Sequence, residues 1–142
     1  MDFPRKIYAI RHNATNRVYV GSSHQVEKRV NNHLSRLRNH KHSVEDMQAD
    51  FDKYGENYTI TILEENIAYE DRFKEYEWMS KKWSALRGYG YNYKDKFYKK
   101  YVRENAEKTE KQLKNIIRNT KNPDDLATLF ITIARAIPKT TQ

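Results

Sequence analysis

The strongest constraint on the fold of this 142-residue chain is a pair of short alternating segments within residues 6–21. Each segment changes side-chain character with a period of two, which is the signature of a β-strand. The polar residues 12–16 between them have the length and turn propensity of a hairpin loop. Tyr8 and Tyr19 each follow a β-branched aliphatic residue, so they occupy equivalent places in the two strands. The pattern predicts a β-hairpin that ends at Gly21, where a missing side chain lets another group approach the backbone.

The residues after the hairpin predict a helix from about residue 25 to residue 38. Its buried stripe is formed by apolar residues at helical spacing: Val26, Val30, Leu34 and Leu37. Arg29, His33 and Arg36 form a polar stripe beside this face. On an arbitrary helix such a stripe is a solvated basic surface. Because this helix begins directly after the hairpin, we expect Arg29 and His33 to lie over the two tyrosines.

A second helix, a third strand from Tyr58 to Leu63 and a third helix from about residue 68 to residue 86 follow. The third helix is expected to bury its apolar residues, which are Phe73, Tyr76, Trp83 and Leu86. Glu77 lies at the rim of that stripe. In isolation it is a surface carboxylate that pairs with a neighbouring lysine. Glu75 is the alternative if the helix has a different register.

In their order and spacing these segments resemble the GIY-YIG endonuclease family, and within it the catalytic domain of phage homing endonucleases. The residues that carry the resemblance are Lys6-Ile7-Tyr8, Tyr19-Val20-Gly21, Arg29, His33, Glu77 and Gly90-Tyr91-Asn92. The match extends over residues 6–94. Lys6 stands where the family has its leading glycine, and Val20 stands where it has isoleucine. Neither change affects a reactive group.

The resemblance implies an α+β fold with a small three-stranded antiparallel or mixed sheet flanked by helices. It also implies a catalytic domain at residues 1–94, which leaves residues 95–142 as a helical C-terminal extension. The implied activity is metal-dependent hydrolysis of phosphodiester bonds in double-stranded DNA. The resemblance implies a single divalent cation as the cofactor, Mg²⁺, with Mn²⁺ as the alternative.

The resemblance also implies the roles of individual residues. Glu77 would be the carboxylate that holds the metal, and Arg29 would hold the scissile phosphate. Tyr8, Tyr19 or His33 would position or deprotonate the attacking water, and the sequence leaves open which of them takes the proton. The remaining candidates are Asn92 in the active site, Gly21 and His42 as supporting residues, and Arg36 and Lys41 with Arg29 as DNA contacts.

The composition indicates which kind of partner the protein binds and which compartment it occupies. Lysine and arginine number 27 against 19 acidic residues, a net charge of +8 that favours a polyanionic partner. The same charge alone also fits a soluble surface or a membrane-surface role. The chain has no cysteine, which excludes disulfides and cysteine-ligated zinc. It shows no apolar run of membrane-spanning length and no signal peptide. We therefore expect a soluble, intracellular protein without membrane association, and the resemblance to phage enzymes implies the cytoplasm of a bacterial host.

Beyond Lys94 the sequence predicts two helices, the second starting at Asn122-Pro123 and carrying an amphipathic stripe that ends at Ile137. They would pack on the nuclease or on a second copy, which makes a homodimer one interpretation. The favoured role is a phage or mobile-element nuclease that acts on foreign or competitor DNA. A restriction or repair nuclease and a non-catalytic basic nucleic-acid-binding module are the alternatives. A pure binder, however, has no need for this whole set of reactive residues.

Overall fold

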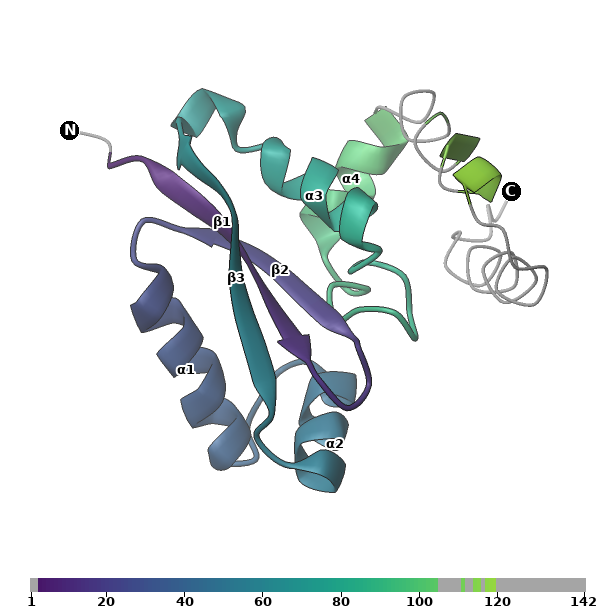
Figure 1. Cartoon of the computed structure of the whole chain (residues 1–142). Helices are drawn as coiled ribbons and strands as arrows, with labels where there is room; N and C mark the ends of the chain where they lie inside the picture. Colours follow the sequence, from purple (N-terminus) through teal and green to yellow (C-terminus); the bar gives the residue numbers. More distant parts are fainter. Residues whose placement is uncertain (1–2, 105–110, 112–113, 116, 120–142) are drawn as a thin grey trace.

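A three-stranded antiparallel sheet organises the computed structural model, which describes residues 3–104, 111, 114–115 and 117–119. Its strands are β1 (Arg5–His12), β2 (Val18–Ser23) and β3 (Tyr58–Ile67). The spatial order is β2-β1-β3, so the first strand pairs with both of the others (Figure 1). The predicted α+β fold with a small flanked sheet is confirmed, and the sheet is antiparallel throughout.

The central strand is buried on both of its faces. Ile7, Tyr8, Ala9 and Ile10 are at most 5% exposed. Ile7 and Ala9 belong to one apolar cluster, whereas Tyr8 and Ile10 belong to the other. The strict alternation of β1 therefore separates two cores rather than a core from solvent.

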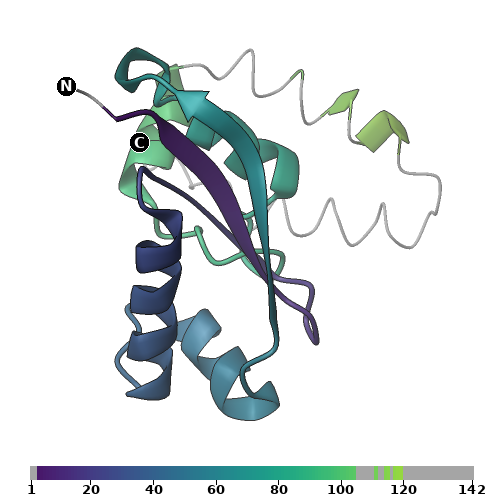
Figure 2. The same cartoon turned by 60° about the vertical axis from the view of Figure 1, so that its left-hand side comes forward.

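Helices cover both faces of the sheet. On the side of Tyr8 lie α1 (Val26–Arg38) and α2 (Glu45–Tyr54), and on the side of Ile7 lie α3 (Lys74–Lys82) and α4 (Lys96–Glu104) (Figures 1 and 2). In α1, Val30 and Leu37 of the predicted stripe are buried, and Val26 and Leu34 are partly buried. The amphipathic pattern of α1 thus agrees with its packing against the sheet.

The third helix is shorter than predicted. A 3₁₀ turn at Tyr69–Asp71 precedes α3, and α3 ends at Lys82, directly before Trp83, which adopts a left-handed conformation with φ of 57°. Phe73 lies ahead of the helix and is 37% exposed, so it does not anchor the buried face. The buried residues of α3 are Met79 and Ser80. The inward face of α3 is therefore rotated relative to the predicted one.

After α3 the chain returns along the outer edge of β2. The backbone N–H of Val18 donates to the carbonyl of Tyr89 at 3.3 Å, and the N–H of Tyr91 donates to the carbonyl of Val18 at 2.9 Å. A Cβ at Gly90 would lie 2.2 Å from the main chain of Ser84, so only glycine fits there. This segment covers an edge strand that would otherwise expose unpaired backbone groups.

Helix α4 packs against α3. The hydroxyls of Ser80 in α3 and Tyr98 in α4 lie 2.9 Å apart, and the rings of Tyr76 and Tyr101 lie 5.3 Å apart. The predicted helix that starts at Asn122 lies outside the described residues, so the homodimer stays a prediction. Within the described part of the chain, every helix is too short or too polar to cross a bilayer.

Candidate active site

Tyr8 and Gly21 face each other across the hairpin, and their contact places the Tyr8 hydroxyl. The two residues are partners in the pairing of β1 with β2. A Cβ at Gly21 would lie 2.5 Å from the Tyr8 hydroxyl oxygen, so the phenol lies directly over the bare backbone of this glycine. The strand continues to Ser23, two residues beyond the predicted end. The expected role of Gly21 is nonetheless seen, and the group that approaches it is Tyr8.

Tyr19 lies on the same face of the sheet as Tyr8, with the two ring centroids 6.4 Å apart. Burial raises the pKa of Tyr19 far above its ordinary value, and the neighbouring Tyr8 adds to this effect. Burial also raises the pKa of Tyr8. Of the two phenols, Tyr8 is the more easily ionised, because Arg29 opposes the effect of burial there through charge and a hydrogen bond.

Arg29 reaches this site from the first turns of α1, which begins three residues after β2. Its guanidinium interacts with Tyr8, Tyr19 and Glu75, as its influence on the pKa of each group shows. The residue is otherwise exposed, so its charge is available to a ligand at the surface. The structure therefore brings together the arginine and both tyrosines that the sequence singled out.

The carboxylate next to Tyr8 and Tyr19 belongs to Glu75, the alternative to Glu77 named from the sequence, and the choice of metal ligand between the two glutamates stays a prediction. Glu75 accepts a hydrogen bond from the Ser22 hydroxyl at 3.1 Å, and its charge raises the pKa of both Tyr8 and Tyr19. Two residues along a helix turn the side chain by about 200°, so the two glutamates leave α3 in nearly opposite directions.

Glu75 is held in a setting that suits a cation. Burial raises its pKa above the ordinary value, while Ser22, Arg5 and Arg29 lower it. A cation on the carboxylate would offset the cost of desolvating it. No group of three or more potential metal ligands occurs among the described residues. A single carboxylate fits Mg²⁺, which keeps several waters and takes its remaining ligands from substrate phosphates.

Ser22 is a site residue that the sequence reasoning missed. It pairs with Ile7 in the sheet, so its side chain lies on the α3 face, opposite to Tyr8. The alternation of side chains along a strand could have indicated this residue. Because Gly21 lies on the Tyr8 face, Ser22 must point toward α3 on the opposite face.

His33 and His42 form a buried pair beside Tyr19. The Nδ1 atom of His33 lies 2.9 Å from Nε2 of His42, and the His33 ring centroid lies 4.6 Å from that of Tyr19. Burial is the main cause that lowers the pKa of His33 to about 4, with further contributions from His42, Arg29 and Arg36. Both predicted histidines are therefore in the site region, and His33 is neutral at pH 7.

Asn92 supports the site through the backbone of β2. Its amide oxygen accepts from the Val20 N–H at 2.8 Å, and its amide nitrogen donates to the Val20 carbonyl at 3.1 Å. The side chain thus continues the pairing that residues 89–91 begin along this edge. It fixes the backbone between Tyr19 and Gly21.

The predicted DNA contacts Arg36 and Lys41 are exposed. Arg36 lies close enough to the histidine pair to lower the pKa of both rings. Lys41 follows directly after α1, and its backbone N–H donates to the carbonyl of Arg36 at 2.8 Å. Both cations flank the side of the site that α1 forms, and their role in DNA binding stays a prediction.

A second buried polar cluster is internally paired. Asp50 accepts a 2.6 Å hydrogen bond from the Tyr91 hydroxyl and lies 3.4 Å from the Arg17 guanidinium. With its charge neutralised and its oxygen bonded, this carboxylate ties α2 to the hairpin and the returning segment. It has the character of a structural ion pair.

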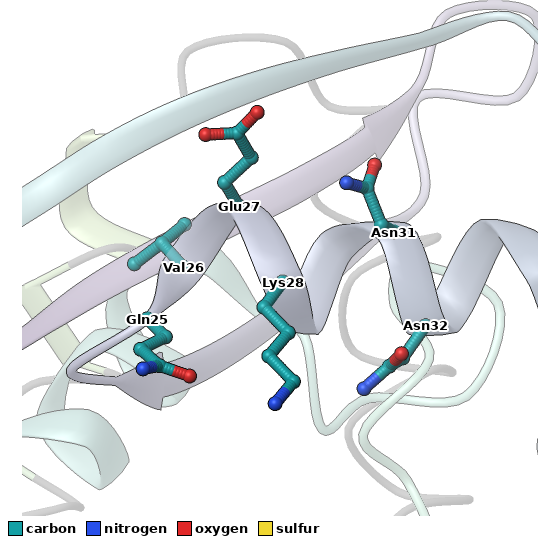
Figure 3. A pocket seen from close by; sticks show the side chains of 6 residues that line it. All are labelled: Gln25, Val26, Glu27, Lys28, Asn31 and Asn32. Carbon is teal, nitrogen blue, oxygen red and sulfur yellow. The ribbon is translucent and has the colours of Figure 1, made fainter.

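One surface hollow lies apart from the reactive residues. It is lined by six residues of α1 and the turn before it: Gln25, Val26, Glu27, Lys28, Asn31 and Asn32 (Figure 3). None of the residues around Glu75 and the tyrosines lines it. A phosphodiester backbone is an exposed chain, so a site at the sheet edge needs no deep cavity to reach it.

Comparison with known proteins agrees with this geometry. Residues 5–92 match the GIY-YIG catalytic domain. The chain is 37% identical over 86 residues to intron-associated endonuclease 1 of Enterobacteria phage T4, an alignment that covers 58% of this chain. It spans only 35% of the length of that relative.

Two solved structures are similar to this chain. The catalytic domain of homing endonuclease I-TevI has a TM-score of 0.54 and 33% identity, and the similarity covers 61% of this chain and 95% of that one. A mutant of the catalytic domain of intron endonuclease I-TevI gives a TM-score of 0.55 and 31% identity, with coverage of 61% and 91%.

Proposed function

Because this chain belongs to the GIY-YIG family of catalytic domains, we propose that it is an endonuclease that hydrolyses phosphodiester bonds of double-stranded DNA with a single divalent cation. Mg²⁺ is the expected ion, and Mn²⁺ is expected to replace it. The observation that carries this proposal is the convergence of Tyr8, Tyr19, Arg29 and Glu75 on one place. They come from two strands and two helices on opposite faces of the sheet.

Glu75 holds the cation in this proposal, with Ser22 orienting its carboxylate. When bound, a divalent cation stabilises the charge that develops on the phosphate and leaving oxygen. Arg29 binds a non-bridging phosphate oxygen, for which a planar and permanently charged guanidinium is well suited.

Tyr8 holds the attacking water and takes its proton after its own phenol proton has been lost to solvent, a loss that Arg29 favours. It is the better acceptor of the two phenols because Arg29 both bonds to it and favours its ionised form. Tyr19 stays protonated, since burial and the adjacent Tyr8 oppose its ionisation. As a hydroxyl donor it can orient the water or a phosphate oxygen.

In biological terms we propose a phage or mobile-element nuclease that acts on foreign or competitor DNA inside a bacterial host cell. Residues 1–94 form the catalytic part in this proposal. Residues 95–142 form a helical extension that packs on it or on a second copy. A homodimer would align two sites for cleavage of both strands.

Supercoiled plasmid incubated with the full chain tests the proposal, with Mg²⁺ in one arm and EDTA in the other. We expect nicking that requires Mg²⁺, and a loss of at least about 100-fold in Glu75→Gln, because an amide cannot provide the charge that the cation needs. Glu77→Gln, two residues away on the same helix, is the matched control and should change the rate by less than about threefold.

Two outcomes would contradict the proposal. If wild-type protein binds DNA without cutting it under any divalent cation, the chain is a basic binding module. If Glu77→Gln is inactive and Glu75→Gln is active, the assignment of the metal ligand to Glu75 is wrong.

A further inference from the structure

The histidine pair beside Tyr19 is held by a hydrogen-bond chain with a fixed direction. The chain starts at the backbone N–H of Val44, which lies 3.0 Å from Nδ1 of His42. A backbone N–H can only donate, so Nδ1 of His42 is an acceptor and carries no proton. In the neutral ring the proton must then be on Nε2.

The direction continues into His33. Nε2 of His42 lies 2.9 Å from Nδ1 of His33, so Nε2–H donates and Nδ1 accepts. The proton of the neutral His33 ring is thereby placed on its own Nε2. This Nε2 atom is buried, and among the described residues it has no hydrogen-bond partner. The ring lies against Tyr19, with the planes inclined at 59°.

Both histidine rings are neutral at physiological pH, as this series of hydrogen bonds requires. Burial lowers the pKa of His33 to about 4, and burial together with Arg36 lowers the pKa of His42. Protonation of His42 would place a second N–H opposite that of Val44 and remove the acceptor.

We propose that Nε2–H of His33, which has no partner among the described residues, is a hydrogen-bond donor available beside Tyr19, that His42 fixes this tautomer, and that His33 therefore does not take the proton from the attacking water. This inference rests on the proposed function. It excludes His33 from the three residues that the sequence left as candidates for accepting the proton of the attacking water. The lone pair of Nδ1 is used by His42, and Nε2 already carries a proton. His33 and His42 are positioning residues beside Tyr19.

Nitrogen NMR of the full chain labelled with ¹⁵N-histidine tests the tautomers without any cleavage assay. We expect both rings to carry their proton on Nε2 at pH 7, with a coupling across the hydrogen bond between Nε2 of His42 and Nδ1 of His33. A proton on Nδ1 of His33 would overturn the proposal. This result stands whether or not the protein cuts DNA, so it separates the inference from the proposed function.

Paired substitutions test the role in cleavage. His33→Gln keeps an N–H donor but offers no basic nitrogen, whereas His33→Leu keeps neither. We expect His33→Gln to retain activity within about tenfold and His33→Leu to lose about 100-fold, the lower range for loss of a positioned group. If both variants lose the same large factor while they unfold at the wild-type temperature, His33 acts as a base and the proposal fails.

The equivalent pair at His42 tests the fixed tautomer. His42→Gln can still donate to Nδ1 of His33, and His42→Leu cannot. We expect the His33 ring of His42→Leu to show a mixture of tautomers and the pH dependence of cleavage to change. His42→Gln should keep the wild-type tautomer and profile. A single wild-type tautomer in His42→Leu would show that His42 does not set it.

Discussion

The side of the site formed by α1 and the side formed by α3 differ in how many of their polar groups already have partners before any ligand binds. On the α1 side, the histidine pair and Tyr8 are buried and Tyr19 is partly buried, and these groups are held by a hydrogen bond between the histidines and by ring packing. On the α3 side, the half-buried Glu75 has one short hydrogen bond, from Ser22. Burial opposes its ionisation, which a cation would favour.

This difference indicates a division of work. The α1 side mainly fixes geometry, because Tyr19, His33 and His42 keep their protonation states at pH 7 and only Tyr8 exchanges a proton in the proposed reaction. The α3 side supplies charge, and its carboxylate is fully stabilised only with a cation present. Substitutions on the α1 side should therefore change the reaction at any metal concentration, whereas those on the α3 side should be compensated in part by more metal.

The largest expected effect comes from Tyr8→Phe on the α1 side. The ring and its contact with Gly21 stay, and only the hydroxyl is lost. We expect cleavage to fall by about 10³-fold, within the range for a general base, and the thermal unfolding midpoint to stay unchanged. Rates measured across a series of Mg²⁺ concentrations should show no recovery. Recovery at high Mg²⁺ would mean that Tyr8 acts through the metal.

The next effect is the pH dependence of stability that His33 contributes. Its pKa in the folded protein is about 4, below the 6.5 of the unfolded chain, so the unfolded state binds more protons between these values. The contribution is complete above pH 6.5 and is lost as the pH falls toward 4, by roughly 3 kcal/mol in all. Denaturant unfolding of the wild type and of His33→Gln at pH 7.5 and 4.5 measures it. An equal loss in both proteins would exclude His33 as its source.

Gly21→Ala should affect both sides through the position of Tyr8. The added Cβ would meet the Tyr8 hydroxyl at 2.5 Å, so the phenol must move. We expect a loss of about 1–3 kcal/mol in the free energy of unfolding, as for other overpacked sites, together with slower cleavage. The double variant with Tyr8→Phe should recover part of the stability but none of the activity. Failure to recover would place the clash elsewhere.

The smallest effect is expected from Ser22→Ala on the α3 side. Loss of the 3.1 Å hydrogen bond leaves the Glu75 carboxylate less well oriented and raises its pKa further. We expect the Mg²⁺ concentration for half-maximal cleavage to rise by about tenfold, with the maximal rate nearly kept. A lower maximal rate at unchanged metal dependence would assign Ser22 to the chemistry instead.

The same two sides differ in how well the sequence predicts them. The α1 side follows from local rules: strand alternation puts Tyr8 and Tyr19 on one face, and helical spacing puts Arg29 and His33 above them. The carboxylate was harder to identify, because the orientation of α3 depends on how it packs. The resemblance implied Glu77 and the register left Glu75 as the alternative, while Phe73, expected as part of the buried face, lies outside the helix.

The sequence did contain a better anchor for α3. Met79 is 1% exposed and lies four residues after Glu75, on the same helical face. The other missed features are long-range. Nothing local to Asn92 indicates that its amide binds the backbone of Val20, 72 positions earlier in the chain. Such pairings follow only from the assembled sheet.

The cover on the outer edge of β2 has a practical consequence for shortening this protein. Residues 89–91 and the side chain of Asn92 occupy the backbone groups of Val18 and Val20. A truncation that ends before residue 89 would free them, and a strand from another molecule could add there. Versions that end before residue 89 should therefore self-associate, whereas those that keep Asn92 should stay dispersed.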